Sequence, residues 1–391
     1  MSAITLETSP DRDPPALIEM FPLMILYAVG FMSATYIPVW VSAAAVRYAV
    51  PVSEVGLIGS CALGAVAVAT ILTAALRSPG PTRLPLVVSL VLSIVFNCLT
   101  ALAPSIRIFT LALILAAVAN GFLLAEVNGR AAASAAPTRV FSGQLFVMMS
   151  FAALFFAIAP RLLTLLGSGA PFFYCAGAGL IALLSVSKLP PAETGRSTAA
   201  ANRAFRLRPS GMLLLAAATL LFIALNVILP FLGVESTRAG ASLATYSRAL
   251  SAGAFVNLVG PIIAERLLRH RASWTPVMTI GIAAMLACAV LITTVDSVSA
   301  FVIGIIFLPF FLLIVIPFYL GLFLESDTSG KLVAVSSAFF MIGTAIGPGL
   351  GGLALNSHGL SGLALVSILI PLLALLATWT GTFQLSRSRI E

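Results

Sequence analysis

Charged residues are scarce in this chain: Asp, Glu, Lys and Arg make up 9% of its 391 residues, whereas 60% are hydrophobic. A soluble globular domain carries about 25% charged residues. A soluble fold of this length keeps much of its surface in water and could not hide so much apolar area. The composition therefore predicts that lipid is the solvent for most of the chain.

Residues that bind metals or act as nucleophiles are also few. The chain has two histidines, His270 and His358, and four cysteines that lie singly within apolar stretches. This spacing favours packing roles over disulfides or metal ligation. The sequence contains no HExxH, GxSxG or GxxxxGK[ST] motif, which argues against an intramembrane enzyme and against an ATP-driven pump. We therefore expect no enzyme, no cofactor and no metal site.

Long apolar runs dominate what is present. A helix needs about 20 apolar residues to cross the hydrocarbon core of a bilayer. Backbone groups without hydrogen-bond partners are too costly in lipid, so each run is expected to be helical. Reading from one polar break to the next gives twelve runs: 20–46, 53–76, 84–103, 108–133, 140–165, 171–187, 211–233, 243–264, 274–294, 299–324, 332–355 and 361–383.

Basic residues predict how these spans are oriented. Cytoplasmic loops of membrane proteins are rich in Lys and Arg. If both termini are cytoplasmic, sixteen of the 21 Lys and Arg residues fall on that side. The net charge of +8 is thus explained by a basic cytoplasmic face, without nucleic acid. We expect a multi-pass monomer in the cytoplasmic (inner) membrane, in contact with lipid. The other side keeps Arg47, Arg107, Arg161, Arg238 and Arg248.

The longest polar stretch lies near the midpoint and divides the chain into two sets of six spans. Equivalent landmarks recur in both sets: Pro38 with Pro230 at an offset of 192, and Pro160 with Pro348 at 188. We therefore expect two pseudo-symmetric six-helix bundles. The expected order is a cytoplasmic tail over 1–19, a bundle over 20–187, a linker over 188–210, a bundle over 211–383 and a tail over 384–391.

Two local motifs resemble the major facilitator superfamily, and the likeness in topology covers nearly the whole chain. After span 8, Gly260 is followed by Glu265-Arg266 and a basic cluster, which is similar to the glycine, Ala-Asp-Arg signature of that family. The corresponding loop of the first half, 75–83, has no acid. Span 11 carries Gly343, Gly347, Pro348 and Gly351, which resembles a glycine-and-proline motif of antiporters that normally lies in span 5.

The resemblance implies an all-α fold with twelve transmembrane helices and a central cavity lined by spans 1, 4, 7 and 10. Polar and aromatic residues of those spans become candidate substrate contacts: Tyr27, Tyr36, Asn120, Asn226 and Tyr319, with Asn257 of span 8 and Gln144 of span 5 as weaker additions. Gly343, Gly347, Pro348, Gly351, Glu265 and Arg266 become candidate gating residues. For each polar candidate taken singly, a hydrogen bond between helices is the favoured explanation over a ligand contact.

Glu126 is the acid that lies well inside a span, and Arg130 follows one turn later on the same helical face. Ionisable residues inside membranes are costly and point to function. Two interpretations remain open. Glu126 carries a coupling proton or meets a cationic substrate, or Glu126 and Arg130 form a structural ion pair.

Arg248 lies about one turn into span 8. Two interpretations remain open here as well. Arg248 binds an anionic substrate, or it pairs with Glu235 or Glu54 at the outer mouth.

Together these features predict a secondary transporter that works by alternating access. The glycine motif and the scarcity of buried charge favour proton-coupled efflux of an amphipathic or hydrophobic small molecule. The alternative is proton-coupled uptake of a small organic anion, with Arg248 or Arg130 providing the positive charge. A channel is disfavoured, because no span shows a polar filter.

Overall fold

A computed structural model describes residues 17–76, 82–134, 137–189, 209–269, 274–327 and 331–387, and every regular element in these ranges is helical. Most of the predicted tails, 1–19 and 384–391, and of the predicted linker, 188–210, lies outside the described residues. The first half contains α1 (Leu17–Thr35), α2 (Ile37–Tyr48), α3 (Val52–Leu76), α4 (Leu84–Leu102), α5 (Ile106–Ala133), α6 (Pro137–Leu166), η1 (Gly167–Gly169) and α7 (Ala170–Val186). The second half contains α8 (Pro209–Ile228), η2 (Leu229–Phe231), α9 (Leu232–Arg238), α10 (Leu243–Asn257), α11 (Val259–Arg269), α12 (Trp274–Thr294), α13 (Val298–Ser326) and α14 (Lys331–Arg387).

The described helices are long and apolar enough for a multi-pass membrane protein. Nine stretches could each cross a bilayer, and the bent pair α1–α2 is a tenth. Two of the nine stretches, 140–186 and 335–387, are 47 and 53 residues long, so each has room for two crossings. Each contains a glycine with positive φ, Gly167 at 64° and Gly359 at 63°, where the helix is interrupted. This arrangement is consistent with the twelve predicted spans.

The first span of each half is broken near a proline. Span 1 bends by 47° at Tyr36, and Pro38 lies in the first turn of α2. Span 7 changes from α8 to α9 through the short helix η2, which contains Pro230. Proline has no backbone N–H and disturbs the helix before it, which explains both breaks. The paired prolines identified in the sequence therefore mark equivalent breaks in the two halves.

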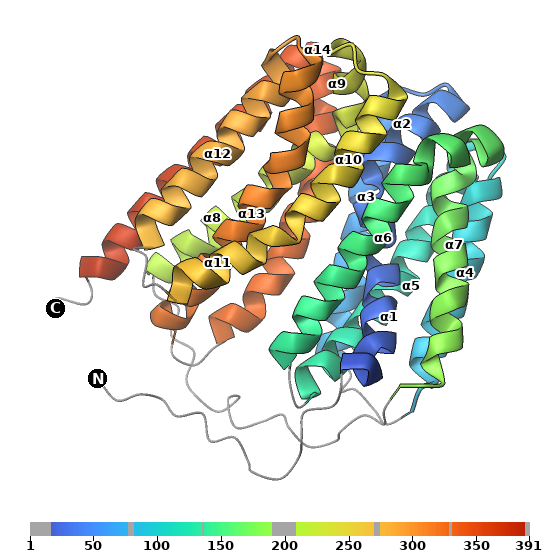
Figure 1. The fold of residues 1–391 in the computed structure, drawn as a ribbon, viewed down its shortest axis with the longest axis horizontal. Helices are drawn as coiled ribbons and strands as arrows, with labels where there is room; N and C mark the ends of the chain where they lie inside the picture. The colour runs from blue at the N-terminus through green and yellow to red at the C-terminus, as the bar shows by residue number, and fades with distance from the viewer. Residues whose placement is uncertain are drawn as a thin grey trace.

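The two halves lie side by side and are closest at one end (Figure 1). We call the end at which α1 begins and α14 finishes the terminal end, and the opposite end the far end. Near the far end, α2 packs on η2 and α9. Helix α3 packs on α14, and α6 packs on α10. Toward the terminal end the helices of the two halves diverge (Figure 1), so the contact between the halves is one-sided.

The positive φ of Gly359 gives a test of the interruption in α14. An added Cβ at Gly359 meets no atom within 4 Å, so Gly359→Ala introduces backbone strain without a clash. We expect it to destabilise the protein by about 1–3 kcal/mol. Gly177, in the interior of α7, also has open space but no positive φ. Gly177→Ala is the matched control and should stabilise by about 0.5–1 kcal/mol. Thermal unfolding in detergent measures both, and equal effects would contradict a chain reversal at Gly359.

Candidate functional site

Among the described residues, three hydrogen bonds join the two halves. Tyr246 of α10 donates its hydroxyl proton to the Pro38 carbonyl of α2 over 2.9 Å, in a buried position. Ser251, also of α10, donates to the Ala153 carbonyl of α6 over 2.9 Å. The Gly349 backbone N–H of α14 donates to the Ser60 hydroxyl of α3 over 2.5 Å. Each of these bonds has a backbone group as one partner, so the two halves are joined through main-chain atoms.

Very close contacts surround these hydrogen bonds. A Cβ built on Gly233 of α9 would lie 2.1 Å from the Ser42 hydroxyl of α2. A Cβ on Gly352 of α14 would lie 2.6 Å from the Ser53 carbonyl of α3. Both distances are shorter than real Cβ contacts. At Gly352 the clash is with backbone, so glycine is required there, whereas at Gly233 the Ser42 side chain can move to make room. We call these contacts and the three hydrogen bonds the closed interface: Pro38, Ser42, Ser53, Ser60, Ala153, Gly233, Tyr246, Ser251, Gly349 and Gly352.

The closed interface ends partway along the helices. On α3, Ser53, Gly56 and Ser60 all approach the second half. One turn further toward the terminal end, a Cβ on Gly64 would meet no atom within 4 Å. The contact between α3 and the second half is therefore confined to the far-end part of the helix.

The glycines of the glycine-and-proline motif in α14 contact two different parts of the protein. A Cβ on Gly343, Gly347 or Gly351 would clash with α8 or η2, within the second half; for Gly347 the Asn226 Cβ would be 2.5 Å away. Gly349 and Gly352, on the other side of the helix, face α3 of the first half. Small residues let helix backbones approach closely. The stripe 343–347–351 is thus a packing contact within one half, and its gating role stays a prediction.

Glu126 and Arg130 are both buried in α5, with 4% and 7% of their surfaces exposed. The Glu126 carboxylate is near enough to interact electrostatically with the Arg130 guanidinium. Arg130 also donates to the Thr82 carbonyl, over 2.8 Å, in the connection before α4. These contacts hold the terminal end of the first half together, which is what the structural interpretation requires.

Asn120 belongs to a polar chain inside the first half. Its side-chain oxygen accepts a hydrogen bond of 2.6 Å from Ser93 of α4, and its amide donates to Ser33 of α1 over 3.4 Å. Asn97 of α4 donates to the Ser93 hydroxyl over 3.2 Å. Buried polar groups need such partners to offset their lost hydration. Asn120 therefore ties spans 1, 3 and 4 together.

The tyrosine candidates differ in their surroundings. Tyr36 is fully buried at the break of span 1, stacks on Phe155 with ring centroids 4.1 Å apart, and donates to the Phe151 carbonyl over 3.4 Å. Tyr319 of α13 is also fully buried, and its hydroxyl contacts that of Thr378 in α14 at 2.5 Å. Tyr27 is partly buried on α1 beside Phe31. Tyr36 and Tyr319 thus make hydrogen bonds within their own halves.

The amide candidates are buried. Asn226 of α8 donates to the Phe222 carbonyl one turn earlier, over 2.9 Å, and its Cβ lies against Gly347. Asn257 is the last residue of α10, before the interruption that separates α10 from α11. Gln144 of α6 is fully buried, and neither of its polar atoms bonds to any described residue. Gln144 is therefore the amide candidate with the greatest unmet hydrogen-bonding capacity.

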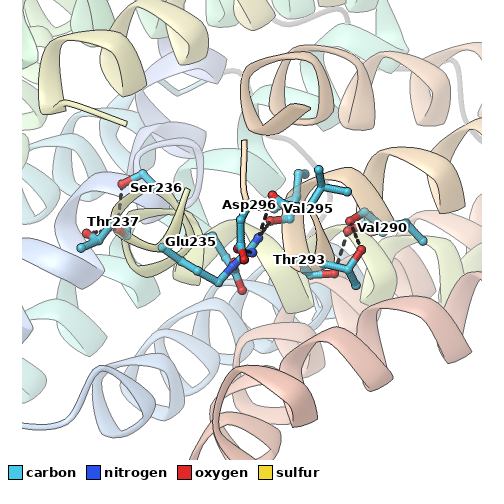
Figure 2. Close-up of polar contacts among 12 residues, drawn as sticks. Glu235, Ser236, Thr237, Val290, Thr293, Val295 and Asp296 are labelled. Atoms are coloured by element: carbon cyan, nitrogen blue, oxygen red, sulfur yellow. Dashed lines mark hydrogen bonds and ion pairs between the residues drawn. The ribbon is translucent and has the colours of Figure 1, made fainter. Parts of the chain in front are cut away.

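Arg248 is exposed on α10. Glu235 does not pair with it; the Glu235 carboxylate instead accepts a hydrogen bond of 2.6 Å from Arg238, which also contacts Asp296 (Figure 2). Among the described residues, Arg248 forms an ion pair with neither Glu235 nor Glu54. Glu265 and Arg266 are exposed on α11, near the terminal end, and their proposed gating role stays a prediction.

The closed interface contains residues that sequence reasoning missed. Ser42, Ser53, Ser60, Tyr246 and Ser251 are single small or polar residues within apolar spans, and nothing in their spacing distinguishes them from packing residues. Gly349 and Gly352 lie in the span 11 motif, but the face to which each glycine belongs depends on the neighbours of α14. The available signal was the pairing of Pro38 with Pro230, because Pro38 accepts the Tyr246 hydrogen bond.

Comparison with solved structures identifies the fold. A bacterial homologue of the human lysosomal transporter Spinster, in an inward-facing and occupied conformation, matches with a TM-score of 0.70 and 13% identity over 96% of this chain and 98% of its own. The same homologue, inward-facing and unoccupied, gives 0.69 and 13% over the same shares. The nucleoside transporter NupG gives 0.68 and 14% over 93% of this chain and 99% of its own.

No protein-family model and no curated protein sequence matches the chain. Identities of 13% and 14% establish a shared fold, and that fold is one of multi-pass membrane transporters. The chain has the major facilitator fold, as the span pattern and the two sequence motifs predicted.

Substitutions at two glycines of α14 distinguish a role in the contact between the halves from a role in packing within one half. Gly352→Ala places a methyl group against the Ser53 carbonyl of the other half, so we expect it to disfavour the closed interface by about 1–3 kcal/mol. Gly347→Ala clashes with α8 of its own half and should lower thermal stability without opening the interface. Disulfide formation between Ser42→Cys and Gly233→Cys, in a background without the native cysteines, reports on closure. Equal cross-linking in both variants would contradict the assignment of Gly352 to the interface.

Proposed function

We propose that this protein is a secondary active transporter that moves a small organic molecule across the cytoplasmic membrane by alternating access. The observation that carries the proposal is the one-sided contact between two six-helix halves, closed at the far end and divergent toward the terminal end. Two halves that touch at one end only can exchange that contact for one at the other end. Because basic residues predict cytoplasmic termini, the conformation described here opens to the cytoplasm.

Efflux of an amphipathic or hydrophobic compound is the direction and substrate class that we favour. The side chains of Asn120, Tyr36 and Tyr319 already form hydrogen bonds within their own halves. Few polar groups are therefore left to bind a strongly polar substrate. Apolar walls with a few polar groups are typical of small-molecule sites. Gln144 is fully buried in this conformation and its amide is unmet by the described residues; we assign it as the polar substrate contact that becomes reachable when the halves move.

Uptake of a small organic anion is the second candidate. It is favoured by Arg248, whose guanidinium is exposed and makes no ion pair with Glu235. A carboxylate substrate would complement this charge with a bidentate hydrogen bond. Arg248→Lys retains the charge but loses the bidentate geometry. A rise in the KM for an anion in both Arg248→Ala and Arg248→Lys would favour uptake over efflux.

The closed interface provides the test of alternating access. Ser42→Cys with Gly233→Cys should cross-link under oxidation, because the two positions are in contact across the halves. The disulfide should abolish transport in proteoliposomes, and a reductant should restore it. Transport of lipophilic cations, organic anions and neutral amphiphiles is measured, and each single-cysteine variant is the control. Undiminished transport by the cross-linked protein would rule out a moving interface at this end.

Glu126 is the candidate for proton coupling. Glu126→Gln removes the titratable group and keeps its shape, so transport driven by a pH gradient should fall by about 100-fold or more, as expected when a proton-transfer group is lost. Exchange of substrate at equal pH should continue, because it needs no net proton movement. If gradient-driven accumulation is unchanged in Glu126→Gln, Glu126 is a structural partner of Arg130 and the coupling group lies elsewhere.

A further inference from the structure

Arg47 joins span 1 to span 3 at the far end of the first half. It lies near the end of α2, and its guanidinium donates to the Ala101 carbonyl over 2.7 Å and to the Ala103 carbonyl over 2.8 Å. Both carbonyls belong to the C-terminal end of α4, where the backbone lacks intrahelical partners and the helix dipole is negative. Tyr48 donates to the same Ala103 carbonyl over 2.8 Å. Arg47 is therefore a cap on α4 provided by α2.

Arg238 does the same for the second half. It is the last residue of α9, and its guanidinium donates to the Ile292 carbonyl over 2.6 Å and to the Val295 carbonyl over 3.5 Å. Helix α12 ends at Thr294, so Arg238 caps α12. Figure 2 shows Glu235 of α9 pointing toward Val295 and Asp296 of this connection. Glu235 and Asp296 both pair with Arg238 and orient its guanidinium.

The two contacts are related by the internal repeat. Arg238 follows Arg47 by 191 positions, and Ile292 follows Ala101 by 191. Val295 follows Ala103 by 192, which is the offset between Pro38 and Pro230 at the breaks of spans 1 and 7. The donor, both acceptors and the nearby helix break thus recur at offsets that agree to within one residue. The residues around each guanidinium differ, Tyr48 in one half and two carboxylates in the other, whereas the bond to the capped helix is the same.

The hydrogen bonds of Arg47 and Arg238 to the helix ends, which we call the clamp, restrict the movement of α2 and α9. Helices α2 and α9 lie beyond the breaks at Tyr36 and at η2, and they carry Ser42 and Gly233 of the closed interface. A short segment beyond a break can swing on that break unless its far end is held. We propose that Arg47 and Arg238 are matched positioning residues that fix α2 to α4 and α9 to α12. Each half then moves as one body, and the interface opens by separation of the halves.

The role of the clamp during opening rests on the proposed function. The clamp contacts themselves are tested on the purified protein without substrate. Arg47→Ala should raise backbone hydrogen–deuterium exchange in α2 by about tenfold, which corresponds to a loss of about 1.4 kcal/mol of local stability. Exchange in 20–35 of α1 should be unchanged. Arg238→Ala should raise exchange in α9 and leave α2 unaffected. Arg47→Lys, which has a single donor group, should give an intermediate value.

Arg107→Ala is the matched control, because Arg107 is an exposed arginine at the same end of the first half. It should leave exchange in α2 and α9 unchanged. Exchange in α2 that is unaltered by Arg47→Ala, or that rises equally throughout α1 and α2, would overturn the clamp, since a general loss of stability is not confined to one segment. Failure to find a transported compound would count against the proposed function and would leave the exchange result intact.

Discussion

Close backbone approach at small residues is the constraint on which this structure depends. Within lipid, helices gain little from hiding apolar surface, so their association relies on packing and on hydrogen bonds. Helix α14 shows the result: Gly347 lies against Asn226 of its own half, while Gly352 lies against the Ser53 carbonyl of the other half. One helix thus packs closely on its own half and on the other half, because glycines lie on both faces.

Backbone groups are partners in the hydrogen bonds between the halves and in those of Arg47 and Arg238. The halves are joined through the Pro38 and Ala153 carbonyls and the Gly349 N–H. Arg47 and Arg238 bind carbonyls at the ends of α4 and α12. Helix ends leave carbonyls without intrahelical partners, which explains why Arg47 and Arg238 bind there. A backbone contact also constrains sequence weakly, because any residue provides the same carbonyl.

Polar residues inside the bundle serve mainly to hold each half together. Asn120 bonds to Ser93 and Ser33, Tyr319 bonds to Thr378, and Arg130 bonds to the Thr82 carbonyl. These bonds lie within one half in every case, which is consistent with rigid halves. The resemblance made Asn120 and Tyr319 candidate substrate contacts from the span of each residue, without knowledge of its rotation, and that role stays a prediction. A helical span exposes different faces to lipid, to neighbours and to the path between the halves, and only packing assigns a residue to one of them.

The sequence by itself determined the solvent, the helical class, the succession of apolar spans, the polar stretch that divides the chain into two halves, and the paired prolines within them. These properties follow from composition and from the need to satisfy every backbone group in lipid, which leaves the chain few choices. Tertiary structure alone determined which face of each span meets which neighbour. It separated Gly347 from Gly349, paired Arg238 with Asp296, and brought Ser42 to Gly233 across almost two hundred residues. The physical reason is that a residue's span is a local property of the chain, whereas its contacts depend on helix rotation and on how the two halves pack together.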